Sequence, residues 1–223
     1  MQYQYVCSLK AVTTATNKLV LGEIARDYLR TKASTKQYFG DLSDKAHLYN
    51  GFQFVGLERN DKDIYNMTSI TSMYVDEVKP RSWPPGTYVW GNSPPEKPYR
   101  KVSEGKKLFE KFVATLNDET TIEEIIERLL MIGTDETKFF PDPQMALQTG
   151  RPPEWYQHST AIMTKFPLEM RRYGTRSHSI LVVDRDDNAT FYEKRIAAPP
   201  KAEHELKWVD KVITFRLEPV NGV

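Results

Sequence analysis

Three arginines and a tyrosine stand close together in residues 171–176, which read Arg-Arg-Tyr-Gly-Thr-Arg. A guanidinium can donate two parallel hydrogen bonds to one carboxylate or phosphate, so this cluster could hold an anionic ligand. The cluster directly precedes a predicted strand, residues 178–184. A solvated basic loop is the competing interpretation, and the residues alone leave both open.

Other motifs for metals or nucleotides are incomplete. Asp184-Arg-Asp-Asp-Asn188 begins like a calcium loop, but Ala189 replaces the required glycine and Arg195 replaces the bidentate glutamate. Gly105-Lys106-Lys107 lacks the upstream glycine and the following hydroxyl of a phosphate loop. The four histidines lack the spacing of a helical zinc site. We therefore expect a strand-connecting turn at residues 184–188 and no metal or nucleotide site.

The one cysteine, Cys7, cannot form an internal disulfide, which agrees with a reducing compartment. Because no histidine is close to it in sequence, we expect a small buried hydrophobe there and not a reactive thiol. The first ten residues lack the pattern of a secretory signal. We therefore expect a cytoplasmic protein.

Charge argues against a nucleic-acid partner, and hydropathy argues against a segment that spans a membrane. Lysine and arginine total 31 against 30 acidic residues, so no surplus of positive charge favours nucleic acid. The apolar runs are shorter than the ~20 residues that cross a bilayer. At 223 residues the length fits one domain.

Three segments have the apolar spacing of amphipathic helices: residues 19–29, 98–117 and 120–133. Pro98 can take the first position of the second helix. Thr120 and Glu123 match a capping box, which predicts the start of the third helix. We expect the second and third helices to pack together at the centre of the fold.

Aromatic and β-branched runs predict strands at residues 51–58, 86–90, 159–166, 178–184, 190–195 and 208–217. The turn pair Asn60-Asp61 follows the first run, so a hairpin is expected there. Residues 139–157 hold four prolines and a glycine, and we expect a long loop without regular elements. Strands on both sides of central helices predict an α+β fold with helices on largely antiparallel sheet.

Three separated blocks occur in a fixed order: His47–Phe52, Pro85–Asn92 with the helix after it, and Tyr173–Arg176 running into the strand to Asp184. Together they resemble the transport and Golgi organisation protein 2 family, also called the NRDE family. The resemblance extends from about Leu9 to Phe215 and includes Pro141-Asp-Pro143. Several spaced blocks are more specific than any one motif.

The resemblance implies a fold like that of N-terminal nucleophile hydrolases, an αββα sandwich of two antiparallel sheets covered by helices on both outer faces. In those hydrolases an N-terminal cysteine attacks an amide carbonyl, and its own α-amino group is the base. Here position 2 is Gln2, and the family's Asn-Arg-Asp-Glu tetrapeptide does not occur. We therefore expect an N-terminally truncated single domain over residues 1–223 that has no catalytic residues and is not an enzyme.

The resemblance also implies which residues line a pocket. Asn92 and Arg176 fall where hydrolases of this fold keep an oxyanion or substrate asparagine and a site arginine. Thr14 stands where relatives carry the asparagine of a Thr-Asn pair, so a second part of the catalytic machinery is expected to be absent. The remaining pocket candidates are Tyr173, Arg171 and Arg172.

From the resemblance we expect a haem trafficking or chaperone-like protein with a role in Golgi organisation and secretion. Haem is the expected cargo, with aromatic walls for its ring and arginines for its propionates, and we expect no catalytic cofactor. His47 and His178 are the candidate axial ligands to the iron. The expected location is the cytoplasm, in association with mitochondria or the Golgi.

Two other interpretations stay open. The first is a cysteine amide hydrolase of the N-terminal nucleophile type whose nucleophile lies in a missing N-terminal segment. The second is a remnant form without a stable site, in which an unpaired sheet edge is exposed. Oligomeric state is not predicted.

Overall fold

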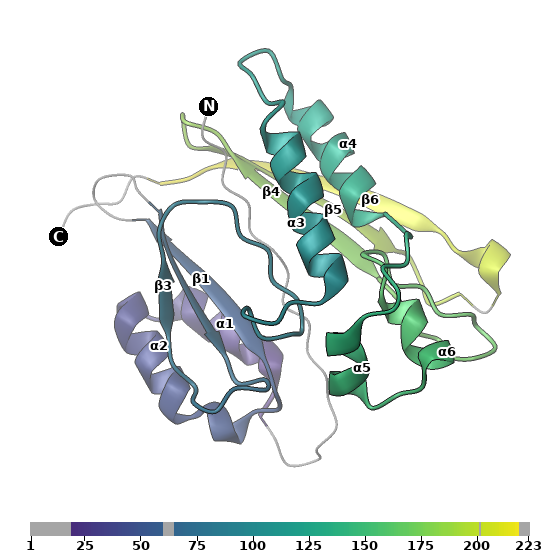
Figure 1. The fold of residues 1–223 in the computed structure, drawn as a ribbon. Helices are drawn as coiled ribbons and strands as arrows, with labels where there is room; N and C mark the ends of the chain where they lie inside the picture. The colour runs from purple at the N-terminus through teal and green to yellow at the C-terminus, as the bar shows by residue number, and fades with distance from the viewer. Residues whose placement is uncertain (1–18, 60–64, 201, 219–223) are drawn as a thin grey trace. The chain divides into compact units, whose positions relative to one another are not determined.

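The computed structural model describes residues 19–59, 65–200 and 202–218, and these combine helices with antiparallel sheet (Figure 1). They fall into two compact units, an N-terminal unit up to Glu96 and a C-terminal unit from Lys97 onward. The predicted α+β class is confirmed. The expectation of one domain over residues 1–223 stays a prediction.

The N-terminal unit begins with helices and continues with strands. Its described elements are α1 (Leu21–Arg30), α2 (Thr35–Asp44), the 3-10 helix η1 (Ala46–Leu48), β1 (Gln53–Arg59), β2 (Tyr65–Thr71) and β3 (Arg81–Trp83). The strands pair antiparallel in chain order, and Phe54 lies opposite Ile70. The predicted hairpin and the first predicted helix are confirmed, while the turn pair Asn60-Asp61 lies outside the described residues.

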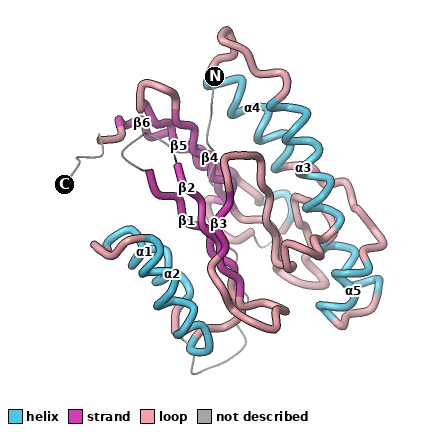
Figure 2. Tube along the Cα trace, turned by 60° about the vertical axis from the view of Figure 1, so that its left-hand side comes forward, coloured by secondary structure: helices cyan, strands magenta, loops and turns pink. Residues whose placement is uncertain are grey.

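Both helices of this unit pack beside its sheet (Figure 2). Helix α2 was not predicted, although Ser34 caps it by accepting a hydrogen bond from the amide of Gln37 at 3.3 Å. Phe39 and Leu42 form its buried face, together with Ile24 of α1. The core of the unit therefore lies between the helix pair and one face of the sheet.

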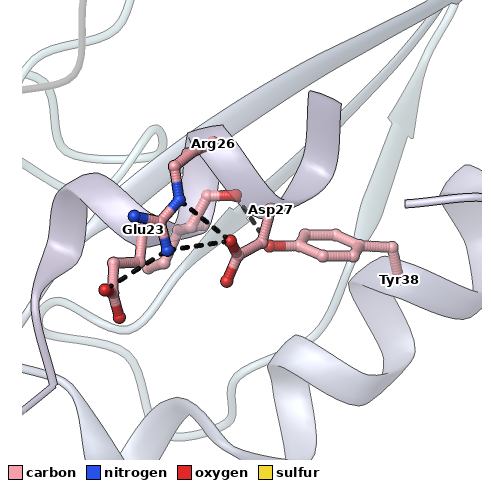
Figure 3. A network of polar contacts seen from close by, with 5 residues as sticks. Glu23, Arg26, Asp27 and Tyr38 are labelled. Atoms are coloured by element: carbon pink, nitrogen blue, oxygen red, sulfur yellow. Dashed lines mark hydrogen bonds and ion pairs between the residues drawn. The ribbon is translucent and has the colours of Figure 1, made fainter. Parts of the chain in front are cut away.

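Tyr38 fixes α2 against α1, because its hydroxyl donates a 2.7 Å hydrogen bond to the backbone carbonyl of Ile24 (Figure 3). Burial, followed by the nearby carboxylate of Asp27, raises the pKa of Tyr38 to about 12, so the hydroxyl stays protonated and able to donate. Outside this contact, Arg26 pairs with Glu23 at 3.3 Å and with Asp27 at 3.2 Å. These three side chains are exposed, so their pairing contributes little stability.

Gly56 of β1 lies where aromatic rings from both helices pack on the sheet. A Cβ atom at this position would lie 2.9 Å from Cε2 of Phe39 and 3.0 Å from Cζ of Tyr28. Those rings are packed against Phe54, with centroid distances of 5.2 Å for Phe39 and 5.4 Å for Tyr28. Only a residue without a side chain fits between them.

The predicted strand at residues 86–90 is wrong. Strand β3 ends at Trp83, before two prolines that lack the N–H donors of a ladder. The following aromatic side chains pack on one another instead: the Trp83 ring lies 4.9 Å from that of Tyr88 and 5.8 Å from that of Trp90. The Tyr88 hydroxyl also donates to the carbonyl of Pro84 at 2.9 Å, which folds the segment back on itself.

The C-terminal unit places helices before its sheet. Its described elements are α3 (Arg100–Val113), α4 (Ile122–Gly133), α5 (Pro143–Thr149), α6 (Pro153–Tyr156), the 3-10 helix η2 (Gln157–Ser159), β4 (Ser177–Val183), β5 (Asn188–Ile196), the 3-10 helix η3 (Glu203–Glu205) and β6 (Trp208–Arg216). Strands β4, β5 and β6 pair antiparallel in chain order. The last three predicted strands are thereby confirmed.

Helices α3 and α4 cover one face of this sheet (Figure 1). Ile180 and Val182 alternate along β4, and Tyr192 lies opposite Ile180 on β5, so all three side chains point to the helices. Phe112 of α3 and Ile125 of α4 meet them in the core. The predicted packing of the two central helices is confirmed.

The cap of α4 lies one residue later than predicted. Thr121 accepts from the Glu124 amide at 3.2 Å, and the Glu124 carboxylate accepts from the Thr121 amide at 2.9 Å. Thr120 is engaged in the preceding turn, where its hydroxyl donates to the Asn117 side chain at 3.2 Å. Two adjacent threonines followed by two glutamates fit the motif in either register, and the turn decides between them.

The expectation that residues 139–157 hold no regular element is wrong, because this stretch forms α5 and α6. Pro143 and Pro153 each occupy the first turn of a helix, where a missing N–H costs nothing. Gly150 ends α5 with φ of 57°, the left-handed conformation that favours glycine. The prolines therefore start helices here.

Asp142 joins the starts of two helices. Its carboxylate is 1% exposed and accepts from the amide of Met145 in α5 at 2.9 Å and from the amide of Arg100 in α3 at 2.7 Å. The Arg100 guanidinium donates to the carbonyl of Pro141 at 2.8 Å. One buried side chain thus satisfies backbone donors of two first turns.

The predicted strand at residues 159–166 is also wrong. Thr160 and Thr164 are buried, and their hydroxyls donate to the carbonyls of Gln157 at 2.7 Å and Ala161 at 3.5 Å. Such local bonds from side chain to backbone hold bends and compete with a ladder. Extended pairing is limited to one bridge between Lys165 and Gly174.

Strand β6 is an edge among the described strands, since it pairs only with β5 there. Its apolar side chains Val209, Val212, Ile213 and Phe215 are 39%, 57%, 41% and 44% exposed. The strand is nevertheless paired along its whole length, from Trp208 opposite Ile196 to Arg216 opposite Asn188.

Gly56→Ala should lower the free energy of unfolding by about 1–3 kcal/mol, because the new methyl group overlaps the rings of Phe39 and Tyr28. Gly40→Ala is the matched control: nothing lies within 4 Å of a Cβ there, and alanine favours helix α2 by up to about 1 kcal/mol. Urea unfolding measures both. Equal effects of the two substitutions would contradict the close approach at Gly56.

Asp142→Ala should destabilise the protein by about 2–4 kcal/mol, because two buried amides lose a charged acceptor. The same substitution at the exposed Asp118 is the control and should change stability by less than about 0.5 kcal/mol. Urea unfolding again gives the comparison. A cost at Asp142 no larger than at Asp118 would show that the two helix starts are held by other contacts.

Candidate functional site

Residues 165–176, named the basic loop from here on, are closed by backbone hydrogen bonds. The Phe166 amide donates to the carbonyl of Tyr173 at 3.1 Å, and the Thr175 amide donates to the carbonyl of Thr164 at 2.8 Å. At Gly174 a Cβ atom would lie 2.7 Å from the Thr164 carbonyl oxygen, so the two segments approach at backbone distance. The predicted basic cluster therefore sits on an ordered loop.

The structure brings Arg171, Arg172 and Tyr173 together in the basic loop and places Arg176 at its end, before β4. The Arg171 guanidinium lies 4.8 Å from the centre of the Tyr173 ring, a cation–π contact. Arg172 and Arg176 are exposed, and no carboxylate of the described residues pairs with either guanidinium. Exposed guanidinium groups that have no carboxylate partner can bind a carboxylate or phosphate.

Three aromatic rings in contact, which we name the aromatic ladder, connect α6 to the basic loop. The Phe166 ring contacts those of Trp155 at 5.8 Å and Tyr173 at 5.5 Å, and the Arg151 guanidinium lies 5.3 Å over the Trp155 ring. His158 also contacts Phe166 at 5.2 Å. Burial, with Lys138 as a second cause, lowers the pKa of His158, which favours its neutral form.

The sequence did not predict this ladder, because Trp155 belongs to α6, while Phe166 and Tyr173 lie seven residues apart in the basic loop. A usable signal was present: Pro152-Pro153 is a helix-start pattern, and it places Trp155 in the first turn. The contact between Trp155 and Phe166 depends on how α6 folds back on the basic loop. No spacing along the chain encodes it.

His178, one candidate axial ligand, lies on β4 and stacks on Trp208 of β6 with ring centres 5.8 Å apart. Burial, followed by the charge of Lys194, lowers the pKa of His178, so the ring is neutral near pH 7. Its Nε2 atom is buried without a hydrogen-bond partner among the described residues. Packing against Gly133 at the end of α4 limits the space on its other side.

His47, the other candidate axial ligand, is exposed on η1 of the N-terminal unit. Its Nδ1 atom lies 3.0 Å from the carbonyl oxygen of Asp44. Because a carbonyl only accepts, Nδ1 donates in this contact. The two histidines belong to different units.

Asn92 lies in the N-terminal unit, two residues after the aromatic cluster of Trp83, Tyr88 and Trp90. Arg81 extends this cluster, with its guanidinium 4.1 Å over Trp83 and 2.7 Å from the carboxylate of Glu96. The pocket candidates are thus divided, since the arginines and Tyr173 belong to the C-terminal unit. Thr14 and Cys7 lie outside the described residues.

The described residues hold no group of three or more histidine, cysteine, aspartate or glutamate side chains that could bind a metal ion. Asp184 accepts from the amides of Asp186 and Asn188, both at 2.9 Å, so the predicted turn between β4 and β5 is confirmed. Of the helices described, none combines the length and the apolar composition that crossing a bilayer requires.

Comparison with known proteins decides the family. The model of the Transport and Golgi organisation 2 family matches residues 8–198. The chain belongs to this family. The match includes Asn92, Asp142 and the basic loop, and the predicted family is confirmed.

Several relatives in the transport and Golgi organisation 2 family align over most of the chain. A transport and Golgi organization protein 2 homolog from Bos taurus is 28% identical over 204 residues, which cover 88% of this chain and 68% of the relative. The homologs from Homo sapiens and Mus musculus are 29% and 27% identical, and each alignment covers 78% of this chain and 60% of the relative. The chain thus spans 60–68% of the length of these relatives.

His178→Phe should make stability less dependent on pH. Because burial lowers the folded-state pKa of His178, the unfolded chain takes up its proton first as the pH falls. The contribution of the neutral ring is complete above about pH 6.5 and is lost as the pH falls from there toward the lowered folded pKa. The phenylalanine variant should therefore lose less stability than the unaltered protein between about pH 7.5 and 5.5.

Thermal unfolding at several pH values measures this effect. His204→Phe, the same substitution at an exposed histidine, should keep the pH dependence of the unaltered protein. If His178→Phe follows the pH profile of the unaltered protein, the buried ring is not the group that senses the pH.

Proposed function

We propose that the chain is a non-catalytic transport protein that acts in Golgi organisation and secretion and carries haem or a related amphipathic anion. Membership of the transport and Golgi organisation 2 family and the names of its relatives support the coarser part of this role. The proposed location is the cytoplasm, in association with mitochondria or the Golgi.

The observation that carries the choice of ligand is the basic loop with its aromatic ladder. Arg172 and Arg176 have no carboxylate partner among the described residues, and Tyr173 lies in the same loop. Haem combines a large apolar ring, which gains from contact with aromatic side chains, with two propionates that seek guanidinium groups. We assign the propionate contact to Arg176, which lies at the end of the loop beside β4.

We also propose the αββα sandwich of the N-terminal nucleophile hydrolases as the fold class. Each unit contributes one pair of helices on one face of a three-stranded antiparallel sheet, which supports this class. An amide-hydrolysis assay on the purified chain tests the proposal that the protein is not an enzyme. Steady hydrolysis of N-acyl amides would favour the amide hydrolase instead.

Arg176→Ala should weaken haem binding roughly tenfold or more, because a charge-assisted contact to a propionate is lost. A Soret titration of the full chain at micromolar haem measures the affinity. Arg185→Ala, in the exposed turn before β5, removes the same charge elsewhere and should leave the affinity unchanged.

Two outcomes would contradict this assignment. If His47→Ala or His178→Ala abolishes the Soret shift while Arg176→Ala preserves it, axial ligation holds the haem. If the unaltered protein gives no Soret shift, haem is not the ligand of this chain.

A further inference from the structure

The tip of the basic loop presents apolar and cationic side chains together. Met170 is 38% exposed and Tyr173 is 37% exposed, and the exposed Arg171 and Arg172 lie between them in sequence. An exposed methionine gains from leaving water, while a guanidinium gains from an anion. A partner for this tip must therefore offer an apolar layer and negative charge side by side.

The backbone holds these side chains in place before any partner arrives. The amides of Met170 and Arg171 both donate to the carbonyl of Pro167 at 3.0 Å, and the Tyr173 amide donates to the carbonyl of Arg171 at 2.8 Å. Behind the tip, Phe166 packs edge-on against Tyr173. Docking through an ordered loop costs less conformational entropy than docking through a disordered one.

The charge of this loop is local. Residues 165–176 hold the cations Lys165, Arg171, Arg172 and Arg176 against one carboxylate, that of Glu169. The whole chain, with 31 basic and 30 acidic residues, is close to neutral. The surplus of positive charge is therefore a property of this loop and not of the chain as a whole.

We propose that the tip of the basic loop docks on the surface of an anionic lipid bilayer. Met170 and Tyr173 enter the headgroup region, where aromatic side chains are favoured, and Arg171 and Arg172 meet the lipid phosphates and carboxylates. A free phosphate would satisfy the arginines but leave Met170 in water, which favours the bilayer. This contact is separate from the binding of a cargo, which the preceding proposal assigns to Arg176.

Vesicle co-sedimentation of the full chain tests the proposal. The protein should bind phosphatidylcholine vesicles that contain phosphatidylserine, and it should not bind vesicles of phosphatidylcholine alone. Each cation near an anionic bilayer strengthens binding about fivefold, so Arg171→Gln/Arg172→Gln should weaken it about 25-fold. Met170→Ser should also weaken binding, and the binding that remains should be more sensitive to salt.

Arg185→Gln/Arg216→Gln is the matched control, because it removes two exposed arginines of the same unit at the end of the sheet opposite the basic loop. It should change vesicle affinity less than twofold. An equal loss in this control, or equal binding to both kinds of vesicle, would overturn the proposal. So would the absence of binding to either.

A free polyanion separates the two sources of phosphate. If inositol hexakisphosphate binds in the absence of vesicles, depends on Arg171 and Arg172, and is indifferent to Met170→Ser, the loop is a phosphate site and the bilayer proposal is wrong. The haem titration is independent of these results, since vesicle binding can persist in a protein that shows no Soret shift. Failure of one proposal is therefore distinguishable from failure of the other.

Discussion

The buried carboxylate of Asp142 is the contact on which most of the C-terminal unit depends. A carboxylate removed from water must be met by donors, and here the donors are the first-turn amides of α3 and α5. Helix α3 carries Phe112 onto the sheet, while α5 is followed along the chain by α6, which holds Trp155. The shared acceptor thus joins the helix that packs on the sheet to the segment that leads to the aromatic ladder.

In the N-terminal unit, the packing of the helices on the sheet depends on a residue that has no side chain. Gly56 lets the rings of Phe39 and Tyr28 descend onto the sheet, where a larger residue would hold the helix layer away. Both units place two helices on one face of three antiparallel strands. On β1 and β4, buried side chains two residues apart supply the face that each sheet turns to its helices.

Elements whose pattern is local were predictable from the sequence, and elements decided by competing contacts were not. The apolar spacing of α1, α3 and α4 and the alternation along β4 and β5 survive in the structure because packing uses them directly. Pro143 alone suggests a break in regular structure. It starts a helix here because Asp142, the residue before it, is the N-cap of α5. In the candidate site, the arginines of residues 171–176 were predictable because they are neighbours in sequence. The aromatic ladder depends on contacts of Phe166 with Trp155 and Tyr173, which no sequence period encodes.

Strand β6, an edge among the strands that the structure describes, bears on how the protein behaves in concentrated solution. Residues 212–215 form an uncharged run of β-branched and aromatic side chains, the composition of cross-β segments. Asp210 and Lys211 precede the run and Arg216 follows it, and charges in these places act as gatekeepers against edge-to-edge stacking. While β6 stays paired with β5, the sheet occupies one edge of this run. Conditions that separate the two strands free both edges, so loss of this one pairing favours association between copies of the chain.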